Sequence, residues 1–327
     1  MTPTTATTRT VVAAIGITAT LAAGCSSPPE PYTVPPTETY SLAPLPQGAT
    51  AVASTALPPP VQCGDPTASL RPFPAGQIPD SASLDAIRQR GRLVVGLDTG
   101  SNLLSFRNPT TDEIEGFDVD IAREIARDLL GSPDKVEFRV LNYAEREQAL
   151  EDGRVDIVAK TMAITCERRQ RIDFSTVYYD AHQRILVMAG SPVRDVSDLA
   201  GRRVCVGEGT TSLERVERQQ PDAAVVTVPM WSDCLVMLQQ NQVDAISTDD
   251  TLLLGLATQD PHSRIVGPNM GDERYGIGVA QGNEDLVRFV NGTLERIRRD
   301  GTWEKIYDRW LSELGPPPGP PPATYRD

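Results

Sequence analysis

The chain has 327 residues and a formal net charge of −13, because 44 Asp and Glu residues outnumber 31 Lys and Arg residues. This length suits one large or two medium domains, since a domain usually takes roughly 100 to 200 residues. The acidic balance argues against the dense basic face that nucleic-acid binding needs, so no nucleic-acid partner is expected. An anionic ligand would have to be held by local cations.

Residues 1–24 predict a signal peptide. Residues 11–23 are apolar or hydroxylic, a run well short of the ~20 residues that cross a bilayer. The stretch from Leu21 to Cys25 resembles the bacterial lipobox, although Ala22 stands where Leu, Val or Ile is usual. The resemblance implies cleavage before Cys25 and a lipid on its sulfur. The protein would then be anchored at the extracytoplasmic face of the plasma membrane, in the cell envelope. An ordinary signal peptide with an incidental cysteine is the alternative.

Proline-rich segments lie near both ends. Residues 25–78 predict a lipidated tether, because the stretch from Ser26 to Gln62 holds ten prolines and no Lys or Arg. Proline favours extended polyproline II at ~3.1 Å per residue, which would hold the folded part away from its anchor. Residues 315–327, with six prolines between Pro316 and Pro322, predict a disordered tail.

Short apolar runs alternate with amphipathic helices between these ends. The run Leu93–Leu97 suits a buried parallel strand, and residues 117–130 carry one apolar face, as a helix does. Further strands are expected at residues 136–141, 155–159, 204–206, 224–228, 243–246 and 277–279. This alternation predicts an α/β fold with parallel sheets. Residues 149–157 and 237–245 share their apolar spacing and a Val-Asp pair, which favours two lobes of like topology.

Four cysteines follow Cys25, and an even number outside the membrane predicts disulfides. Three pairings are possible. We favour Cys205 with Cys234, inside one lobe, and Cys63 with Cys166, which would attach the N-terminal extension to the other lobe.

A series of motifs between Leu84 and Leu314 resembles, in its order, the periplasmic-type solute-binding proteins of the polar amino-acid family. The similarity is closest to glutamine-, glutamate- and aspartate-binding members. The motifs are Leu93–Asp98, Gly116–Ala122, Val155–Ala159, Thr165–Arg169, Ile172–Ser175 with Tyr178 and Tyr179, and Asp300–Thr302 near Trp310. The prolines, the acylated cysteine and the extra cysteine pairs resemble actinobacterial GlnH-like lipoproteins.

The resemblance implies a two-lobe fold of the periplasmic-binding-protein type II, with hinge-linked, parallel-rich sheets and a ligand in the cleft between them. Lobe 1 would take residues 79–177 and 276–314, and lobe 2 residues 183–270. Two hinge crossings would lie at residues 178–182 and 271–275. Closure around the ligand would be a hinge-bending motion.

The same resemblance implies a set of ligand-binding residues. A zwitterionic amino acid needs a bidentate cation for its carboxylate and an anion for its ammonium group. Arg168, in the first turn of a helix capped by Thr165, matches the carboxylate clamp, and Asp249 matches the ammonium acceptor. Arg168 could instead pair with an acidic surface neighbour, and Asp250 is the alternative acceptor or a helix cap. Further matches to pocket positions are Asp98, Ser101, Tyr143, Thr161, Ala163, Gly209, Thr210 and Thr211.

One position of this set departs from the family pattern, and one segment has a physical reason of its own to bind a ligand. Tyr143 matches an aromatic wall, but Ser101 occupies the place of the aromatic expected opposite it. Thr210 and Thr211 precede a helix at residues 213–219, where hydroxyls and free amides favour an anion. Ser212 is expected to be a simple N-cap of that helix.

Lys160 is the residue from which we predict specificity. Its position usually carries a small residue, and a lysine that ends the strand at 155–159 would point its ammonium group at the cleft. A cation beside Arg168 suits a second carboxylate, so aspartate or glutamate is favoured over glutamine or asparagine. A solvated lysine at a strand end is the alternative.

The predicted function is therefore capture of a polar amino acid and its presentation to an ABC permease by a monomeric, membrane-anchored protein. A sensor that reports ligand to a membrane receptor and a signalling kinase is the alternative, and it would use the same site. A dehydratase-type enzyme on this fold is a third hypothesis, but the sequence shows no nucleophile elbow, metal cluster or paired acids. His182 and His262 are too few and too far apart for a metal site, and no cofactor is expected.

Overall fold

The computed structural model describes residues 43–53, 57–74 and 80–327. The predicted signal peptide and Cys25 lie outside the described residues. Among the residues described, no helix has the length and the apolar character that a membrane crossing requires.

The first of two main sheets has five strands in the order β6-β2-β7-β15-β8, and with its helices it is called lobe 1 below. The strands are β2 (Leu93–Leu97), β6 (Val136–Val140), β7 (Ile157–Val158), β8 (Ile172–Phe174) and β15 (Gly278–Ala280). The helices are α1 (Ala82–Arg90), α2 (Phe117–Leu130), α3 (Arg146–Glu151), α7 (Glu284–Arg299) and α8 (Thr302–Trp310), with the 3-10 turns η1 (Arg168–Gln170) and η3 (Ser312–Leu314). A small sheet of β3 (Gly100–Ser101), β4 (Ser105–Arg107) and β5 (Ile114–Glu115) lies between β2 and α2 in the chain.

The second sheet, with its helices called lobe 2, has seven strands in the order β1-β11-β10-β12-β9-β13, and β14 also pairs with β9. The strands are β1 (Thr50–Ala51), β9 (Tyr179–Met188), β10 (Arg203–Gly207), β11 (Ala224–Val228), β12 (Ala245–Asp249), β13 (Ser263–Val266) and β14 (Asp272–Tyr275). The helices are α4 (Thr211–Gln219), α5 (Trp231–Gln239) and α6 (Asp250–Ala257), with the 3-10 turn η2 (Val196–Leu199).

The two lobes repeat one topology, as the shared pattern at residues 149–157 and 237–245 predicts. In lobe 1, β2 is parallel to β6 and β7, and in lobe 2, β10 is parallel to β11 and β12. The aspartate of each Val-Asp pair has the same task. Asp156 accepts a hydrogen bond from the backbone N–H of Val94 in β2 (2.7 Å), and Asp244 accepts one from that of Arg203 in β10 (2.8 Å).

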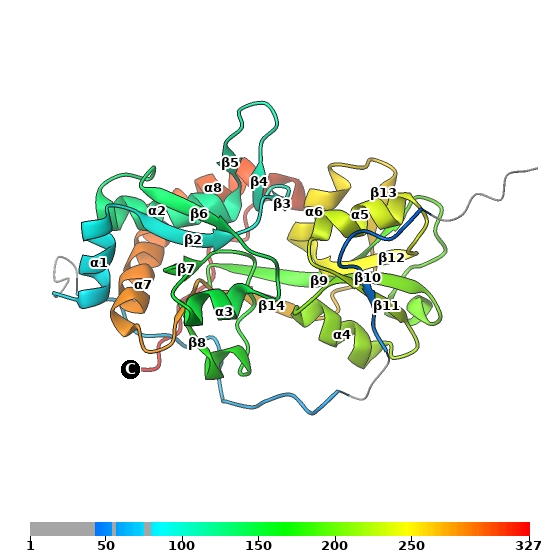
Figure 1. Ribbon diagram of the computed structural model, residues 1–327, viewed down its shortest axis with the longest axis horizontal. Coiled ribbons are helices and arrows are strands. Elements are labelled where there is room, and N and C mark those ends of the chain that lie inside the picture. Colours follow the sequence, from blue (N-terminus) through cyan, green and yellow to red (C-terminus); the bar gives the residue numbers. More distant parts are fainter. Residues whose placement is uncertain (1–42, 54–56, 75–79) are drawn as a thin grey trace, which may run out of the picture. The chain divides into compact units, whose positions relative to one another are not determined.

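The chain passes between the lobes through β9 and β14, which pair antiparallel with Tyr179 opposite Tyr275 and His182 opposite Asp272. Figure 1 shows β9 as one long arrow from this pairing into the second sheet. The two segments are those for which hinge crossings are predicted. Their aromatic side chains pack with α8: the Tyr179 and Trp303 rings are stacked with centroids 6.3 Å apart.

Both predicted disulfides are confirmed. Cys205 in β10 is bonded to Cys234 in α5, and Cys63 is bonded to Cys166 in lobe 1. The first bond lies inside lobe 2, and the second attaches the N-terminal segment two residues ahead of Arg168.

The prediction of an extended, free tether is wrong for its described part. β1 pairs antiparallel with the edge strand β11, and Gln242 donates to the carbonyl of Ala43 (2.5 Å). Further along, the Ser69 hydroxyl donates to the Phe174 carbonyl (2.7 Å), and Leu70 is buried. Proline does not prevent this packing, because the residues between prolines still supply N–H groups and apolar side chains.

The prediction of a disordered tail is also wrong. Tyr325 forms a parallel bridge with Ser69 and donates its hydroxyl to Glu295, and Asp327 pairs with Arg288 (2.6 Å). The carbonyl of Pro321 accepts from Arg298 (3.0 Å). Proline carbonyls remain good acceptors, and the polar residues beyond them anchor the segment on lobe 1.

Candidate functional site

One narrow pocket takes side chains from both lobes. Its lining residues are Tyr143, Arg146, Thr161 and Arg168 from lobe 1, and Thr210, Thr211, Ser212, Trp231, Thr248, Asp249 and Leu252 from lobe 2. Most of them follow the C-terminal ends of strands or begin helices, which is where open α/β sheets place ligands. Six of the eleven ligand-binding residues predicted from the sequence line this pocket: Tyr143, Thr161, Arg168, Thr210, Thr211 and Asp249.

Arg168 is buried, and its guanidinium group is held on three sides. It donates to the carbonyls of Ala163 (2.7 Å) and Gly209 (3.1 Å) and to the carboxylate of Glu147 (3.2 Å). The predicted cap is present, since the Thr165 hydroxyl accepts from the backbone N–H of Arg168 (3.2 Å). Arg168 therefore lines the pocket and also pairs with an acidic neighbour, and its role as a carboxylate clamp stays a prediction.

Arg146 is a pocket residue that the sequence analysis missed. It is the first residue of α3, is 2% exposed, and donates to the carbonyls of Tyr143 (2.8 Å), Lys160 (3.2 Å) and Gly209 (3.2 Å). Among the described residues, no carboxylate lies within ion-pair distance of it. Burial, together with the charge of Arg168, lowers the pKa of Arg146 to about 9. The one available signal was an arginine three positions after Tyr143 on the face of α3 that also carries buried Ala149 and Leu150.

The carbonyl of Gly209 joins the two lobes at this site. It belongs to lobe 2 and accepts hydrogen bonds from both lobe 1 arginines, Arg146 and Arg168. Gly209 has a φ of +67°, and a Cβ there would lie 3.0 Å from the Cα of Ala144. A larger residue would therefore disturb both the turn and its contact with lobe 1.

Lys160 does not point into the pocket, which corrects the prediction based on it. Its ammonium group lies 3.1 Å from the carboxylate of Asp98, donates to the carbonyl of Leu141, and sits 4.0 Å from the centre of the Tyr143 ring. Both charged side chains are 1% exposed, so the solvated alternative is wrong as well. Burial lowers the pKa of Lys160 to about 8, although Asp98 opposes this effect. The reason is local: Asp98 and a carbonyl offer a buried ammonium group the partners that it needs.

Ser101 belongs to the same buried group beneath Tyr143. Its hydroxyl donates to Asp98 (2.9 Å) and lies 3.1 Å from the Tyr143 hydroxyl. An aromatic residue of lobe 2 contacts Tyr143 instead, since the ring of Trp231 meets Tyr143 edge-on with centroids 5.8 Å apart. Gly207 makes room for it, because a Cβ there would lie 2.9 Å from Cζ2 of Trp231.

Thr161 is held in a strained backbone conformation, with a φ of +40°. Its N–H donates to Asp118 (2.8 Å), and the other carboxylate oxygen of Asp118 accepts from the hydroxyl of Tyr178 (2.8 Å). Burial raises the pKa of the Asp118 carboxyl to about 7. Asp118 thus fixes the turn that presents Thr161 to the pocket.

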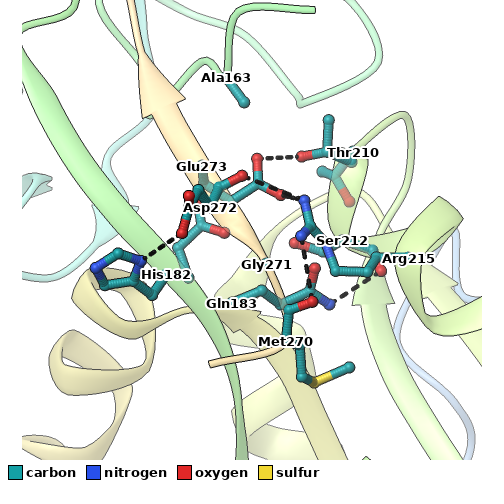
Figure 2. Close-up of polar contacts among 12 residues, drawn as sticks. Ala163, His182, Gln183, Thr210, Ser212, Arg215, Met270, Gly271, Asp272 and Glu273 are labelled. Carbon is teal, nitrogen blue, oxygen red and sulfur yellow. Dashed lines mark hydrogen bonds and ion pairs between the residues drawn. The ribbon is translucent and has the colours of Figure 1, made fainter. Parts of the chain in front are cut away.

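The start of α4 brings lobe 2 groups to the pocket. Thr210, not Ser212, is the N-cap of this helix, because its hydroxyl accepts from the N–H of Leu213 (3.3 Å). The Thr211 hydroxyl donates to Glu273 in β14 (2.8 Å), and Glu273 also pairs with Arg215 (2.6 Å). Figure 2 labels Thr210, Arg215 and Glu273 and marks the pairing of Glu273 with Arg215 by a dashed line. Ser212 instead contacts the hydroxyl of Thr248 (3.2 Å).

Asp249 is the carboxylate of the pocket. One oxygen accepts from the Tyr275 hydroxyl (2.5 Å), and the other, Oδ1, is buried without a partner among the described residues. Burial and the nearby Glu273 raise the pKa of Asp249 well above its usual value. Asp250 does not line the pocket. Its carboxylate accepts hydrogen bonds from the backbone N–H groups of His182 (3.2 Å) and Thr251 (2.9 Å). An arriving ammonium group would supply the partner that Oδ1 lacks.

The pocket offers no metal-binding set, and the described part of the chain holds no group of three or more His, Cys, Asp or Glu side chains placed to bind a metal. What it offers is two guanidinium groups, one carboxylate, hydroxyls and an aromatic pair. Such a set can hold a small zwitterion by its charged ends.

Comparison with known proteins agrees with this chemistry. Residues 93–313 match the bacterial extracellular solute-binding proteins, family 3. The chain is 35% identical over 232 residues to the ABC transporter glutamine-binding protein GlnH of Bacillus subtilis, a match that covers 71% of this chain and 85% of that protein. It is 30% identical over 237 residues to the glutamate-binding protein GluB of Corynebacterium glutamicum, covering 69% and 80%.

A solved structure shares the fold as well. An ancestral arginine-binding protein bound to glutamine has a TM-score of 0.64 at 35% identity, and the match covers 68% of this chain and 98% of that one. The two lobes, the pocket between them and the sequence matches lead to one conclusion. The chain belongs to the bacterial extracellular solute-binding proteins of family 3, which are binding proteins and not enzymes.

Proposed function

We propose that the protein binds an acidic amino acid, aspartate or glutamate, between its lobes and presents it to an ABC transporter. The observation that carries the ligand class is Arg146. Its guanidinium group lines the pocket, is buried, and has no carboxylate partner among the described residues. A buried charge is costly unless it is paired. The ligand is the remaining source of that partner.

Charge matching supports the same class. An acidic amino acid has two carboxylates and one ammonium group. The pocket is lined by two guanidinium groups, those of Arg146 and Arg168, and by one carboxylate, that of Asp249. Glutamine or asparagine would leave one guanidinium facing a neutral amide. The preference for aspartate and glutamate was first inferred from Lys160, and it now rests on Arg146.

The relatives support the amino-acid ligand and the transport role. One is named an ABC transporter glutamine-binding protein, and another is named a glutamate-binding protein. These names span an amide and an acid, so the choice between them rests on the charges in this pocket.

The lipid anchor and the hinge belong to the same proposal. The sequence around Cys25 supports lipid attachment at the outer face of the plasma membrane, where we propose that the mature chain acts as a monomer. The pairing of β9 with β14 supports the two crossings as a hinge. In the structure, Gly209 of lobe 2 already accepts hydrogen bonds from the two lobe 1 arginines, so opening about the hinge would break these bonds.

Calorimetry with aspartate, glutamate, asparagine and glutamine tests the ligand. We expect an acid to bind at least roughly tenfold more tightly than its amide. Tighter binding of glutamine or asparagine would overturn the acid preference, and binding of none would overturn the function. Uptake of radiolabelled aspartate by a deletion strain then separates delivery from sensing. Lost uptake supports delivery, whereas normal uptake with a lost cellular response supports the receptor alternative.

A further inference from the structure

The chain has three tryptophans, and their indole N–H groups differ in one respect. Trp303 donates to the carbonyl of Tyr178 (2.7 Å), and Trp310 donates to the carboxylate of Asp120 (2.7 Å). Trp231 is 2% exposed, and its Nε1 is buried without an acceptor in the part of the chain that the structure describes. A buried N–H without a partner is rare in native proteins and calls for an explanation.

The position of Trp231 provides that explanation. Trp231 lines the same pocket as Arg146, Arg168 and Asp249. Within the described chain, three pocket-lining residues have a buried side-chain atom without a hydrogen-bond partner: Thr161, Trp231 and Asp249. The carboxylate of Asp249 can only accept when it is ionised, and the indole of Trp231 can only donate. The free acceptor of Asp249 therefore suits an ammonium group, and the free donor of Trp231 suits an oxygen atom.

The indole cannot easily turn away to find another partner. One face of it meets Gly207, where a Cβ would lie 2.9 Å from Cζ2, and the ring also meets Tyr143 edge-on at 5.8 Å. Trp231 begins α5, so its backbone is fixed by the helix. A donor held in this way loses little freedom when it forms a bond to a ligand.

We propose that the Trp231 Nε1–H group donates a hydrogen bond to an oxygen of the bound amino acid and so acts as a specificity-determining residue of the pocket. The inference rests on the proposed function, because it needs an amino acid in this site. The lobe 2 aromatic adds a donor that a phenyl ring would lack.

NMR of the wild-type protein labelled with ¹⁵N-tryptophan tests this directly. The three indole N–H signals can be assigned with the variants Trp231→Phe and Trp310→Phe. On addition of aspartate, we expect the Trp231 signal to move downfield and its hydrogen exchange to slow, while the Trp303 signal moves little. If the Trp231 signal stays in place although calorimetry shows that aspartate binds, the inference is wrong and the proposed function stands. If no amino acid binds, both fall.

Affinity provides a second test. Trp231→Phe keeps a ring but removes the donor, so aspartate should bind roughly 10- to 100-fold more weakly. Trp310→Phe is the matched control, because it removes an indole N–H outside the pocket, and its affinity should equal that of the wild type. Equal affinity of Trp231→Phe would reduce Trp231 to a packing contact. A loss for aspartate without one for 2-aminobutyrate identifies the side-chain oxygen as the acceptor, and equal losses identify the α-carboxylate.

Discussion

Lys160 and Asp98 form an ion pair with a nitrogen-to-oxygen distance of 3.1 Å, and both side chains are 1% exposed. The ammonium group of Lys160 lies 4.0 Å from the centre of the Tyr143 ring, and neither Lys160 nor Asp98 lines the pocket. The charges of the pair cancel inside the protein, so they are not available to a ligand. Lys160 therefore stabilises the fold and does not bind the ligand, so its substitution should lower the free energy of unfolding.

Lys160→Met should therefore destabilise the fold by roughly 3 to 5 kcal/mol, because it leaves the Asp98 carboxylate buried without its partner. Urea unfolding measures this loss. The double variant Lys160→Met with Asp98→Asn should recover part of the stability. Any loss of affinity should be similar for aspartate and asparagine. A loss confined to aspartate and glutamate would show instead that Lys160 contacts the side-chain carboxylate of the ligand.

Arg146→Met should weaken aspartate binding by roughly 2 to 5 kcal/mol and asparagine binding much less, because only the acid loses a buried counter-ion. Calorimetry with both ligands measures the difference. Arg154→Met is the matched control, since Arg154 is largely exposed and lies outside the pocket. Equal losses for the two ligands would show that Arg146 does not read the second carboxylate.

Arg168→Ala should weaken acids and amides alike, by roughly 2 to 5 kcal/mol, because the α-carboxylate is common to all of them. Arg171→Ala serves as the control, as Arg171 pairs with the same Glu147 but is exposed to solvent. Unchanged affinity of the Arg168 variant would mean that another group holds the α-carboxylate. The contrast between Arg146 and Arg168 separates the two ends of the ligand.

Asp118→Asn should change how stability depends on pH. The pKa of Asp118 is about 7 in the folded protein, above its ordinary value of 3.8, because the carboxyl is buried. The protonated form is therefore favoured by folding, and its contribution is full below pH 3.8 and is lost as pH rises through about 7. Relative to the wild type, the variant should gain up to about 4 kcal/mol between pH 4 and pH 8. Denaturation at both pH values measures this gain, and an equal difference at the two would contradict it.

The two disulfides should differ in their effects on protein stability and on amino-acid affinity. Removing Cys205 and Cys234 together, as alanines, should cost roughly 3 kcal/mol of stability, since the bond closes a loop with a sequence separation of 29 inside lobe 2. Removing Cys63 and Cys166 detaches the N-terminal segment from the loop that carries Arg168, so it should also weaken amino-acid binding. Thermal unfolding and calorimetry on both variants measure the two effects. Identical affinities would show that the second bond does not support the loop.

Local patterns were enough to predict much of the fold. β2 and β11 have the bounds that their apolar runs predict, and α2 has the bounds of its apolar face, because burial of a short strand or of one helix face is encoded by neighbouring residues. For β9, only the first residues were predicted, and they were predicted as a hinge crossing and not as a strand. Its ten residues pair in turn with β14, β12 and β13, and pairing with distant segments leaves no local pattern.

The candidate site was predictable where a family motif includes the residue and unpredictable where long-range packing decides. Arg168 and Asp249 were named from motif positions, and both line the pocket. Lys160 directly follows the Val155–Ala159 motif, but its orientation depends on Asp98, 62 positions away in the chain. Trp231 and Arg146 were missed because their partners, Tyr143 and Gly209, come from the opposite lobe.

The N-terminal segment also determines how a mechanical load would enter the protein. A pull on the chain ahead of Ala43 meets the hydrogen bonds from Gln242 and then the pairing of β1 with β11, which a few backbone hydrogen bonds hold. Weak tension would be absorbed there, at the edge of lobe 2. Stronger tension would peel β1 away and pass to the covalent bond between Cys63 and Cys166. Since Cys166 stands two residues before Arg168, the force would then act on the loop that carries the guanidinium clamp.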